Sequence, residues 1–239
     1  MSSSSKSAPF VAIVDYGMGN LRSVYNALSF VAQGSGLDVK ITNNPADVAN
    51  ADRILLPGQG AMGDCVAELN RSGMRDVVLR AAESKPLFGI CVGMQMLLSH
   101  SEENDTQGLN LIPGSVRKFQ LQDALQADGS RFKVPQMGWN TVHYSADGVV
   151  HPLFNGVADG SHFYFVHSFF AATQTPAHCA GQTHYGDWFC AAIARDNLFA
   201  TQFHPEKSAD QGLTLYKNFL NWNPLGLRAH PFLPRPFST

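Results

Sequence analysis

A cysteine between two glycines is the clearest candidate for chemistry in this chain. Gly89-Ile-Cys91-Val-Gly93 reads G-x-C-x-G, which is the nucleophile-elbow pattern G-x-S-x-G with sulfur in place of oxygen. A nucleophile of this kind sits on a strained turn, where side chains two residues away would collide with the neighbouring backbone. The pattern favours a nucleophilic Cys91; the alternative is an inert buried cysteine, as most free cysteines are.

A histidine and a glutamate near the C-terminal end supply the groups that such a cysteine needs. His204-Pro-Glu206 follows a predicted strand, and a spacing of two lets both side chains project the same way from an extended backbone. A thiol nucleophile needs a base, and the base needs an acceptor that orients it. Taken alone, the segment also fits a surface His-Pro turn with a solvated glutamate.

The helix that is predicted after Cys91 would assist the chemistry. Its first turn offers unpaired backbone N–H groups and the positive end of the helix dipole, which stabilise a thiolate. The N–H of Val92 is therefore a candidate oxyanion donor. Backbone N–H groups of Gly58-Gln59-Gly60, a turn that closes another predicted strand, are candidates for the other half of the oxyanion hole.

The same turn opens a match to the dinucleotide-binding pattern G-x-G-x-x-G, from Gly58 to Gly63. It follows the third predicted strand instead of the first, and no acidic residue closes a following strand about 20 residues on. Glu83 lies at that distance, but within a predicted helix. The segment is therefore predicted to be a flexible turn at the carboxyl end of a strand, and we expect no dinucleotide or other cofactor.

Strands and helices alternate through the first half of the chain. Buried strands are predicted over 10–14, 37–41, 53–56 and 86–90, with helical segments between them at 21–31, from 45, and up to about 83. Asn20 is predicted to cap the first helix, and Asn44-Pro45 to open the second. This order predicts an α/β fold with an open mixed, mainly parallel sheet flanked by helices.

The second half reads as short strands that would extend this sheet in antiparallel fashion. They are predicted over 116–119, 139–144, 162–166, 169–173, 179–183, 188–195 and 198–203, with a hairpin turn at 195–197. A final helix is predicted over 209–222, with Leu213, Tyr216 and Leu220 on its apolar face. Three segments result: a disordered start at 1–9, one domain over 10–222, and a proline-rich tail at 223–239.

Composition limits the possible partners. The 239 residues carry a net charge of −2, and no basic cluster indicates nucleic acid or an anionic membrane surface. No run of 18 apolar residues predicts a transmembrane helix, and the serine-rich start lacks a signal-peptide h-region. Four cysteines in a chain of this length do not form a disulfide scaffold, so we expect a reducing, cytoplasmic location.

Four residues of types that bind metals lie close together in the sequence, but their spacing is not that of a metal site. They match no paired C-x2-C or H-x3-H pattern, so they are predicted to be strand residues and no metal site is expected. These residues are His178, Cys179, His184 and Cys190.

These motifs resemble the class I (triad) glutamine amidotransferases. Gly89 to Gln95 and His204-Pro-Glu206 match the triad pattern. Four longer stretches, at 15–24, 56–60, 135–140 and 204–208, narrow the likeness to the glutaminase subunits of imidazole glycerol phosphate synthase. The resemblance covers roughly residues 10–222 and implies a flavodoxin-like glutamine amidotransferase fold with a nucleophile elbow.

The resemblance implies a catalytic triad and an oxyanion hole. Cys91 would attack the amide carbon of glutamine, with His204 as general base and acid and Glu206 as the group that orients it. The backbone N–H groups of Gln59 and Val92 would form the oxyanion hole, after a peptide flip in the PGQG strand.

Further residues are implied as contacts to the substrate and to a partner. Gly58, Gly60 and Gln95 would lie against L-glutamine, while Trp139 and Lys207 would take part in coupling to the partner.

The implied partner is a cyclase subunit with a (β/α)8 barrel, in a heterodimer that channels ammonia into histidine biosynthesis. A roof over the site would keep ammonia from becoming ammonium in bulk water. The family often has histidine where Gln136 stands, so the role of that side chain is open.

Three other interpretations remain at this stage. The chain could serve a different synthase of the same superfamily, although the DYGMGN and PQMGWN segments disfavour this. It could be a non-catalytic interaction subunit, which the intact triad disfavours. It could also be a free-standing thiol hydrolase, which would work without any partner.

Overall fold

The computed structural model describes residues 8–121, 124–126, 128–145 and 149–224. The predicted disordered start and proline-rich tail lie outside these residues, except at 8–9 and 223–224. Within the described ranges, no helix has the length and apolarity needed to cross a membrane.

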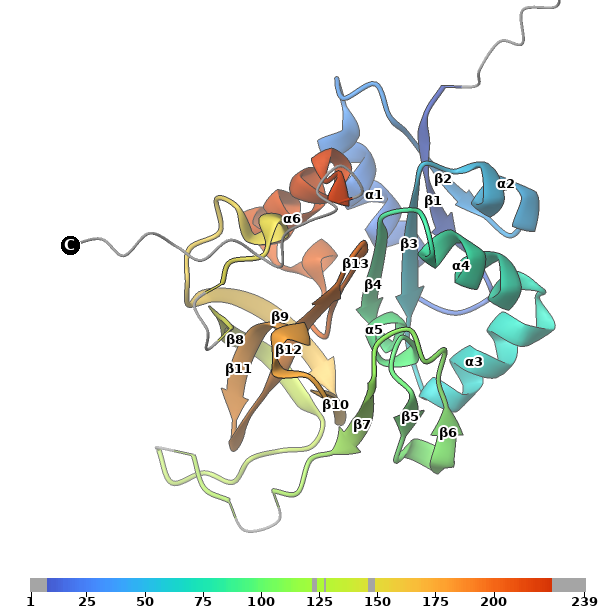
Figure 1. Cartoon of the computed structure of the whole chain (residues 1–239). Coiled ribbons are helices and arrows are strands. Elements are labelled where there is room, and N and C mark those ends of the chain that lie inside the picture. The colour runs from blue at the N-terminus through green and yellow to red at the C-terminus, as the bar shows by residue number, and fades with distance from the viewer. Residues whose placement is uncertain (1–7, 122–123, 127, 146–148, 225–239) are drawn as a thin grey trace, which may run out of the picture.

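Four strands from the first half of the chain and β13 from near its C-terminal end build a parallel sheet in the order β2-β1-β3-β4-β13. This is the flavodoxin-like order 2-1-3-4-5, as predicted. Helices α1 and α6 cover one face of this sheet, and α3 and α4 cover the other (Figure 1). The strands are β1 (Phe10–Val14), β2 (Asp38–Thr42), β3 (Arg53–Gly58), β4 (Leu87–Cys91) and β13 (Leu198–Thr201). The helices are α1 (Leu21–Ala32), α2 (Pro45–Asn50), α3 (Met62–Arg71), α4 (Met74–Ala82), α5 (Val92–Met96) and α6 (Ala209–Asn221).

The central strand β4 is buried along its whole length because helices cover both faces. The ring of Phe88 packs edge-on against Phe199 of β13 and Phe219 of α6, and lies 5.9 Å from the ring of Tyr216. Aromatic pairs of this geometry add to the free energy gained by burying the rings. They fix α6 against the strand that ends at Cys91.

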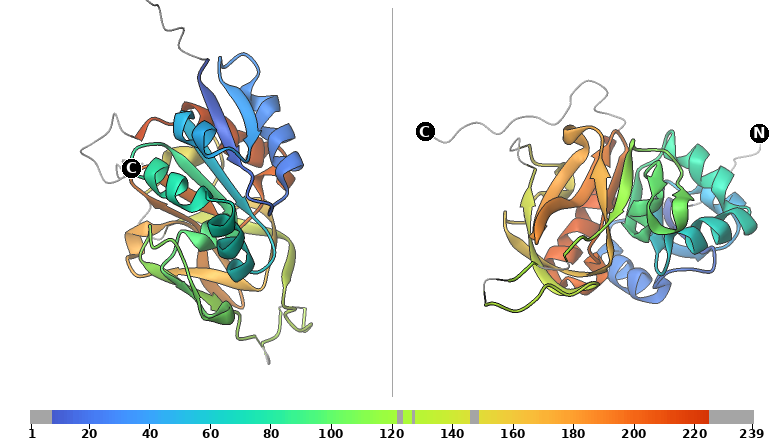
Figure 2. Two further views of the ribbon diagram at one scale, coloured as in Figure 1. Left: turned by 90° about the vertical axis from the view of Figure 1, so that its right-hand side faces the viewer. Right: turned by 90° about the horizontal axis from the view of Figure 1, so that it is seen from below.

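The second half adds antiparallel strands beyond β13, as predicted. The path continues through β12, β10, β7, β5 and β6, while β11 pairs with β12 and β8, and β8 pairs with β9. Figure 2 shows strands β8 to β12, in yellow to orange, on the side of the molecule away from α3 and α4, whereas β6 contacts α3. Their bounds are β5 (His100–Ser101), β6 (Thr106–Gln107), β7 (Gly114–Lys118), β8 (Gln136–Tyr144), β9 (Ser161–His167), β10 (Phe169–Thr173), β11 (Cys179–Tyr185) and β12 (Asp187–Arg195). Short 3-10 helices are η1 (Glu103–Asp105), η2 (Pro152–Phe154), η3 (Pro176–His178) and η4 (Pro205–Lys207).

Strand β3 runs two residues past its predicted end at Leu56. It continues because Pro57 pairs with Ile90 and Gly58 with Cys91 of β4. Strand β1 pairs with β3 only as far as Leu55, so the proline falls where one neighbouring strand has already ended.

Other differences are local. Asn20 precedes α1 but makes no side-chain cap, since its ψ of 64° departs from the extended cap geometry. Asn44 does cap α2, accepting from the N–H of Ala46 at 3.0 Å. His178 ends η3 instead of lying in a strand. Strands β5 and β6 were not predicted, because two residues give no detectable period.

The glycines of the elbow are required by close backbone contacts. A Cβ on Gly93 would lie 2.0 Å from the Leu56 carbonyl oxygen of β3, and one on Gly89 would lie 2.9 Å from the Gly93 carbonyl oxygen. Cβ atoms do not approach other atoms this closely, so a side chain at Gly93 would push α5 away from β3, and one at Gly89 would push α5 away from β4. This is the collision expected from the G-x-C-x-G pattern.

We predict that Gly93→Ala lowers the free energy of unfolding by at least ~3 kcal/mol. The added Cβ would meet backbone atoms of β3, which cannot rotate out of the way as a flexible side chain can. Gly34→Ala is the control, since Gly34 has φ +78° but nothing within 4 Å of an added Cβ. It should cost only the ~1–2 kcal/mol of left-handed strain. Urea denaturation of the two variants measures the difference, and equal losses would contradict the steric account.

Candidate active site

Cys91 is the last residue of β4 and stands directly before α5. Its φ of 55° and ψ of −110° are unusual for a residue with a Cβ, as expected for a strained elbow. The residue is 5% exposed, and Val92 begins α5, so the Val92 N–H is among those without an intrahelical acceptor. The predicted strand, turn and helix are therefore confirmed.

The PGQG segment lies beside Cys91 because β3 and β4 are parallel neighbours. Gly58 is the register partner of Cys91, and it is buried. Gln59 and Gly60 follow at the exposed end of the strand. This places the candidate oxyanion donors and substrate contacts at one sheet edge. The match to the dinucleotide-binding pattern, from Gly58 to Gly63, forms a strand, a turn and the start of a helix. Glu83 is the C-terminal cap of α4, so it lies at a helix end and not at the end of a strand.

His204 and Glu206 meet beyond the end of β13, next to Cys91 in the sheet order. His204 Nδ1 lies 2.8 Å from Glu206 Oε1, and the side chains are 8% and 1% exposed. The predicted extended backbone is wrong here, because Pro205 opens the 3-10 helix η4 directly after His204. The surface-turn interpretation is excluded by this burial.

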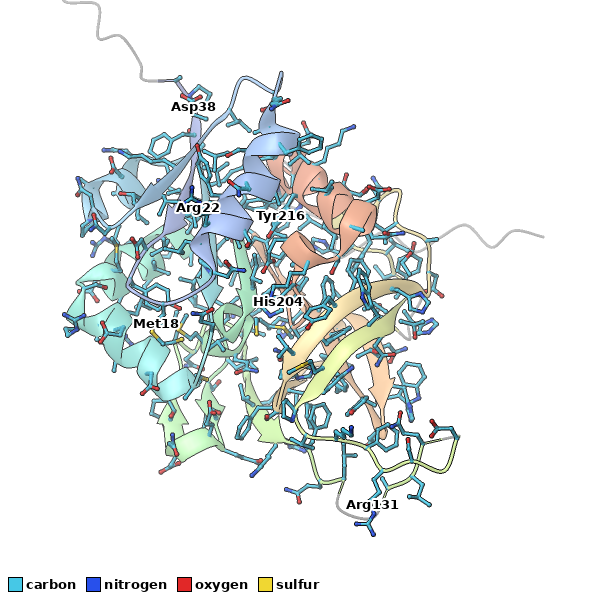
Figure 3. The ribbon with its side chains drawn as sticks, turned by 180° about the vertical axis from the view of Figure 1, so that it is seen from behind. Met18, Arg22, Asp38, Arg131, His204 and Tyr216 are labelled. Atoms are coloured by element: carbon cyan, nitrogen blue, oxygen red, sulfur yellow. The ribbon has the colours of Figure 1, made fainter. Side chains whose placement is uncertain are left out.

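The backbone of His204 is fixed by β9 and α6. Its N–H donates to the Tyr164 carbonyl at 2.9 Å, and the Ser208 hydroxyl donates to its carbonyl at 2.6 Å while accepting from the Tyr164 N–H. A Cβ on Gly212 of α6 would lie 1.8 Å from the Pro205 carbonyl oxygen, so α6 packs directly on this turn. Figure 3 shows His204 near the centre of the molecule, below α6 and Tyr216.

Tyr216 is a polar neighbour of the triad that the sequence did not reveal. Its hydroxyl lies 3.4 Å from Glu206 Oε2. Burial raises the pKa of the Tyr216 phenol well above its usual value, and the Glu206 charge adds to this, so the hydroxyl stays a donor. The sequence pattern placed Tyr216 on the apolar face of the last helix. At such a position the sequence does not distinguish a tyrosine whose hydroxyl has a polar partner from one that only packs in the core.

Charge at His204 is set by its two acidic neighbours. Burial alone would lower the pKa of His204, but its interactions with Cys91 and Glu206 outweigh burial and raise the pKa to about 10. The Nε2 atom is buried and, in the part of the chain that the structure describes, has no hydrogen-bond partner. The raised pKa favours the imidazolium form of His204 at neutral pH.

Two glutamines connect Cys91 to the neighbouring strands. Gln202 is fully buried, and its amide nitrogen lies 3.7 Å from Cys91 Sγ. The amide group of Gln95 donates to Gln202 Oε1 at 3.0 Å and to the Phe169 carbonyl at 3.1 Å. Both N–H groups of Gln95 are thus engaged within the protein, and its oxygen is the atom left for a substrate.

Gln202 was missed because it reads as one residue of a strand. The only available signal was its position two residues before His204, on a strand expected to end at the site.

The predicted partner-coupling residues lie on one surface around Tyr164. Trp139 of β8 is 54% exposed, and its ring lies 6.1 Å from that of Tyr164. Lys207 Nζ lies 5.5 Å from the centre of the Tyr164 ring. The neighbouring Met137 is 66% exposed. Because the Tyr164 carbonyl also holds the His204 N–H, this surface adjoins the triad.

Gln136 lies on the same strand but is buried. Its side-chain oxygen lies 2.9 Å from His167 Nε2, and His167 Nδ1 lies 2.7 Å from the Phe169 carbonyl. Burial lowers the pKa of His167 to about 4, so this ring stays neutral. Gln136 thus contacts a buried neutral histidine one carbonyl away from Gln95.

The described residues contain no cluster of three or more His, Cys, Asp or Glu side chains able to hold a metal ion. Cys179 and Cys190 lie on the adjacent strands β11 and β12, as predicted for strand residues.

The sequence matches the family Glutamine amidotransferase class-I over residues 12–222. The chain belongs to this family. The match spans Cys91, His204 and Glu206, and it covers the parallel sheet except for the first two residues of β1.

Within this family, the chain is similar to proteins of one name. An imidazole glycerol phosphate synthase subunit HisH from Aromatoleum aromaticum is 52% identical over 214 residues, covering 90% of this amidotransferase and 99% of the relative. The protein of the same name from Nitrosomonas europaea is 47% identical over 214 residues, with the same coverage of both chains.

Solved structures share the fold. A putative GMP synthase protein from Thermoplasma acidophilum superposes with a TM-score of 0.62 at 20% identity, covering 90% of this amidotransferase and 94% of that chain. The glutaminase domain of a Trypanosoma brucei CTPS gives a TM-score of 0.58 at 15% identity, covering 90% and 95%.

We predict that Glu206→Gln shifts the alkaline limb of the pH–rate profile for glutamine hydrolysis to lower pH. In the parent protein this limb reports loss of the His204 proton near pH 10, and removing the carboxylate charge lowers that pKa. The profile of kcat/KM between pH 6 and 11, ~ten points per variant, measures the shift. Superimposable alkaline limbs would show that Glu206 does not set the proton affinity of His204.

We predict that Gln202→Met lowers kcat for glutamine hydrolysis by at least about 10-fold, since a hydrogen bond to a charged sulfur is lost. The rate of Cys91 alkylation by iodoacetamide should fall with it. Gln107→Met, at an exposed position of β6, is the matched control and should change neither rate. An unaltered alkylation rate in the Gln202 variant would contradict a direct contact with the thiolate.

Proposed function

We propose that this amidotransferase is the glutaminase subunit of an imidazole glycerol phosphate synthase, with residues 10–222 as its catalytic domain. It hydrolyses L-glutamine and passes ammonia to a cyclase subunit in histidine biosynthesis. Family membership and relatives of that name at about 50% identity support the assignment. The observation that carries the chemistry is the buried 2.8 Å contact between His204 and Glu206, placed beside the Cys91 elbow.

The first half of the proposed reaction forms a thioester. The Cys91 thiolate attacks the amide carbon of glutamine, and the negative charge that develops on the amide oxygen is held by the N–H groups of Val92 and Gln59. The imidazolium of His204 gives its proton to the leaving nitrogen, which departs as ammonia. A raised pKa suits this step, because the proton is already in place at neutral pH.

The second half releases glutamate. Neutral His204 takes a proton from water, the hydroxide oxygen bonds to the thioester carbon, and the C–S bond breaks to return the Cys91 thiolate and the imidazolium. Glu206 holds the ring through Nδ1 during both proton transfers. Gly58, Gly60 and the free oxygen of Gln95 are proposed to contact the bound glutamine.

The proposed partner surface is formed by Met137, Trp139, Tyr164 and Lys207. Exposed methionine and tryptophan beside a polar rim are typical of protein interfaces. The cyclase, which is a (β/α)8 barrel in this proposal, would cover the triad from this side and receive ammonia without its passing through bulk water. A cytoplasmic location stays a prediction.

We predict that Cys91→Ala abolishes glutamate release from glutamine and leaves the fold intact, because no other group can form the thioester. Glutamate release should be weak for the parent chain alone and rise strongly once the cyclase and its ligand are added. Cys190→Ala removes a half-buried thiol elsewhere in the chain and should leave turnover unchanged. Circular dichroism melting of each variant checks the fold.

The outcomes separate the competing functions. Full activity of the chain alone points to an independent hydrolase, and unchanged turnover in Cys91→Ala removes the proposed mechanism. A chain that stays silent with this cyclase serves a different synthase or has no catalytic role.

A further inference from the structure

The PGQG segment beside Cys91 is held by two side chains that the proposed mechanism does not use. Tyr16, directly after β1, donates its hydroxyl to the Pro57 carbonyl at 2.7 Å. Cys65 of α3 donates its S–H to the Gln59 carbonyl, with 3.2 Å between sulfur and oxygen. Tyr16 is 2% exposed and Cys65 is fully buried, so water does not compete for these carbonyls.

Both side chains remain donors at neutral pH. Burial, with a smaller effect of Cys65, raises the pKa of the Tyr16 phenol well above its usual value. Burial also raises the pKa of the Cys65 thiol, and this outweighs the opposing hydrogen bonds to Tyr16 and Gln59.

The loop after β1 encloses the segment further. A Cβ on Gly19 would lie 3.3 Å from the Pro57 ring, and one on Gly60 would lie 3.6 Å from Met18 Cε. Figure 3 labels Met18, which lies on this loop. The DYGMGN motif, which the triad chemistry leaves without a role, thus packs along the PGQG segment.

Gly58 is enclosed from both sides. A Cβ there would lie 3.0 Å from the Tyr16 hydroxyl and 2.7 Å from the Gly93 N of the elbow. A glycine is therefore required at this point, and its backbone dihedrals are less restricted than those of the flanking Pro57 and Gln59.

The two held carbonyls flank the Gly58–Gln59 peptide. The Pro57 and Gln59 carbonyls belong to the peptides before and after it. A peptide can turn over by opposite changes in ψ of Gly58 and φ of Gln59 while both flanking peptides stay in place. The hydrogen bonds from Tyr16 and Cys65 therefore restrain the two neighbouring peptides and do not themselves hold the Gly58–Gln59 peptide.

We propose that Tyr16 and Cys65 are positioning residues for the oxyanion hole. They fix both ends of the Gly58–Gln59 peptide, so that its rotation brings the Gln59 N–H to the oxyanion without displacing the strand. This inference rests on the proposed function, because the Gln59 N–H matters only when Cys91 attacks an amide. A purely structural role for the two residues would change stability and leave the catalytic step untouched.

The test compares Tyr16→Phe, Cys65→Ala and Cys65→Ser in the full chain, assembled with the cyclase and its ligand. Tyr16→Phe should lower kcat for glutamine about 3- to 10-fold, the effect of one lost hydrogen bond, with KM unchanged. Cys65→Ala should lower kcat in the same way, and Cys65→Ser, which keeps a donor, should restore most of it.

The rate of Cys91 alkylation by iodoacetamide distinguishes a loss of oxyanion stabilisation from a structural defect, because a structural defect at the site would also change this rate. Attack on an alkyl iodide develops no oxyanion, so its rate should match the parent protein in all three variants. Ser72→Ala is the matched control, because Ser72 at the end of α3 also donates from a side chain to a carbonyl, at 3.2 Å, but far from the segment. It should leave kcat unchanged.

Each result decides the matter. A parent complex without glutaminase activity refutes the proposed function. An active parent with unchanged kcat in Tyr16→Phe and Cys65→Ala refutes the positioning role, as does a parallel fall in kcat and alkylation. If Tyr16→Phe loses cooperative melting, the Cys65 pair decides alone.

Discussion

The pairing of β4 on both sides is the constraint on which the site depends. Its register with β3 places Gly58 beside Cys91, and its parallel pairing with β13, Thr201 opposite Ile90, leads the chain to Gln202 and His204 at the same edge. Carboxyl ends of parallel strands meet at one edge, where open α/β sheets bind ligands. The nucleophile, its base and the PGQG segment therefore converge, although His204 lies more than a hundred residues from the other two in the sequence.

The elbow and the triad stabilise each other. Strain at Cys91 is tolerated because Gly89 and Gly93 allow β3 and α5 to close around it. Burial of His204 would disfavour its charged form, and the acidic groups on either side reverse this. The buried Glu206 carboxylate in turn has the His204 ring on one oxygen and the Tyr216 hydroxyl near the other. Charge that would be costly to bury singly is thus balanced within one group of contacts.

The elements around the elbow were predictable because short motifs with strong steric demands encode them. The glycines around Cys91 and the pair His204 and Glu206 each have a common alternative use when taken alone, and it is their occurrence together in one chain that predicts a triad. The finer site was not predictable. Gln202, Tyr216, Tyr16 and Cys65 all read as ordinary core residues, and only the tertiary fold turns their polar atoms toward the site. The extension of β3 through Pro57 likewise depends on where β1 stops pairing, which no local pattern records.

Acid quenching of the complex during turnover of glutamine, followed by peptide mass spectrometry, tests the central claim most directly. The account predicts a transient mass increase of one glutamyl group on the peptide that contains Cys91, lost on longer incubation as the thioester is hydrolysed. A glutamyl group on a peptide containing Cys65, Cys179 or Cys190, or turnover without any covalent adduct, would contradict it.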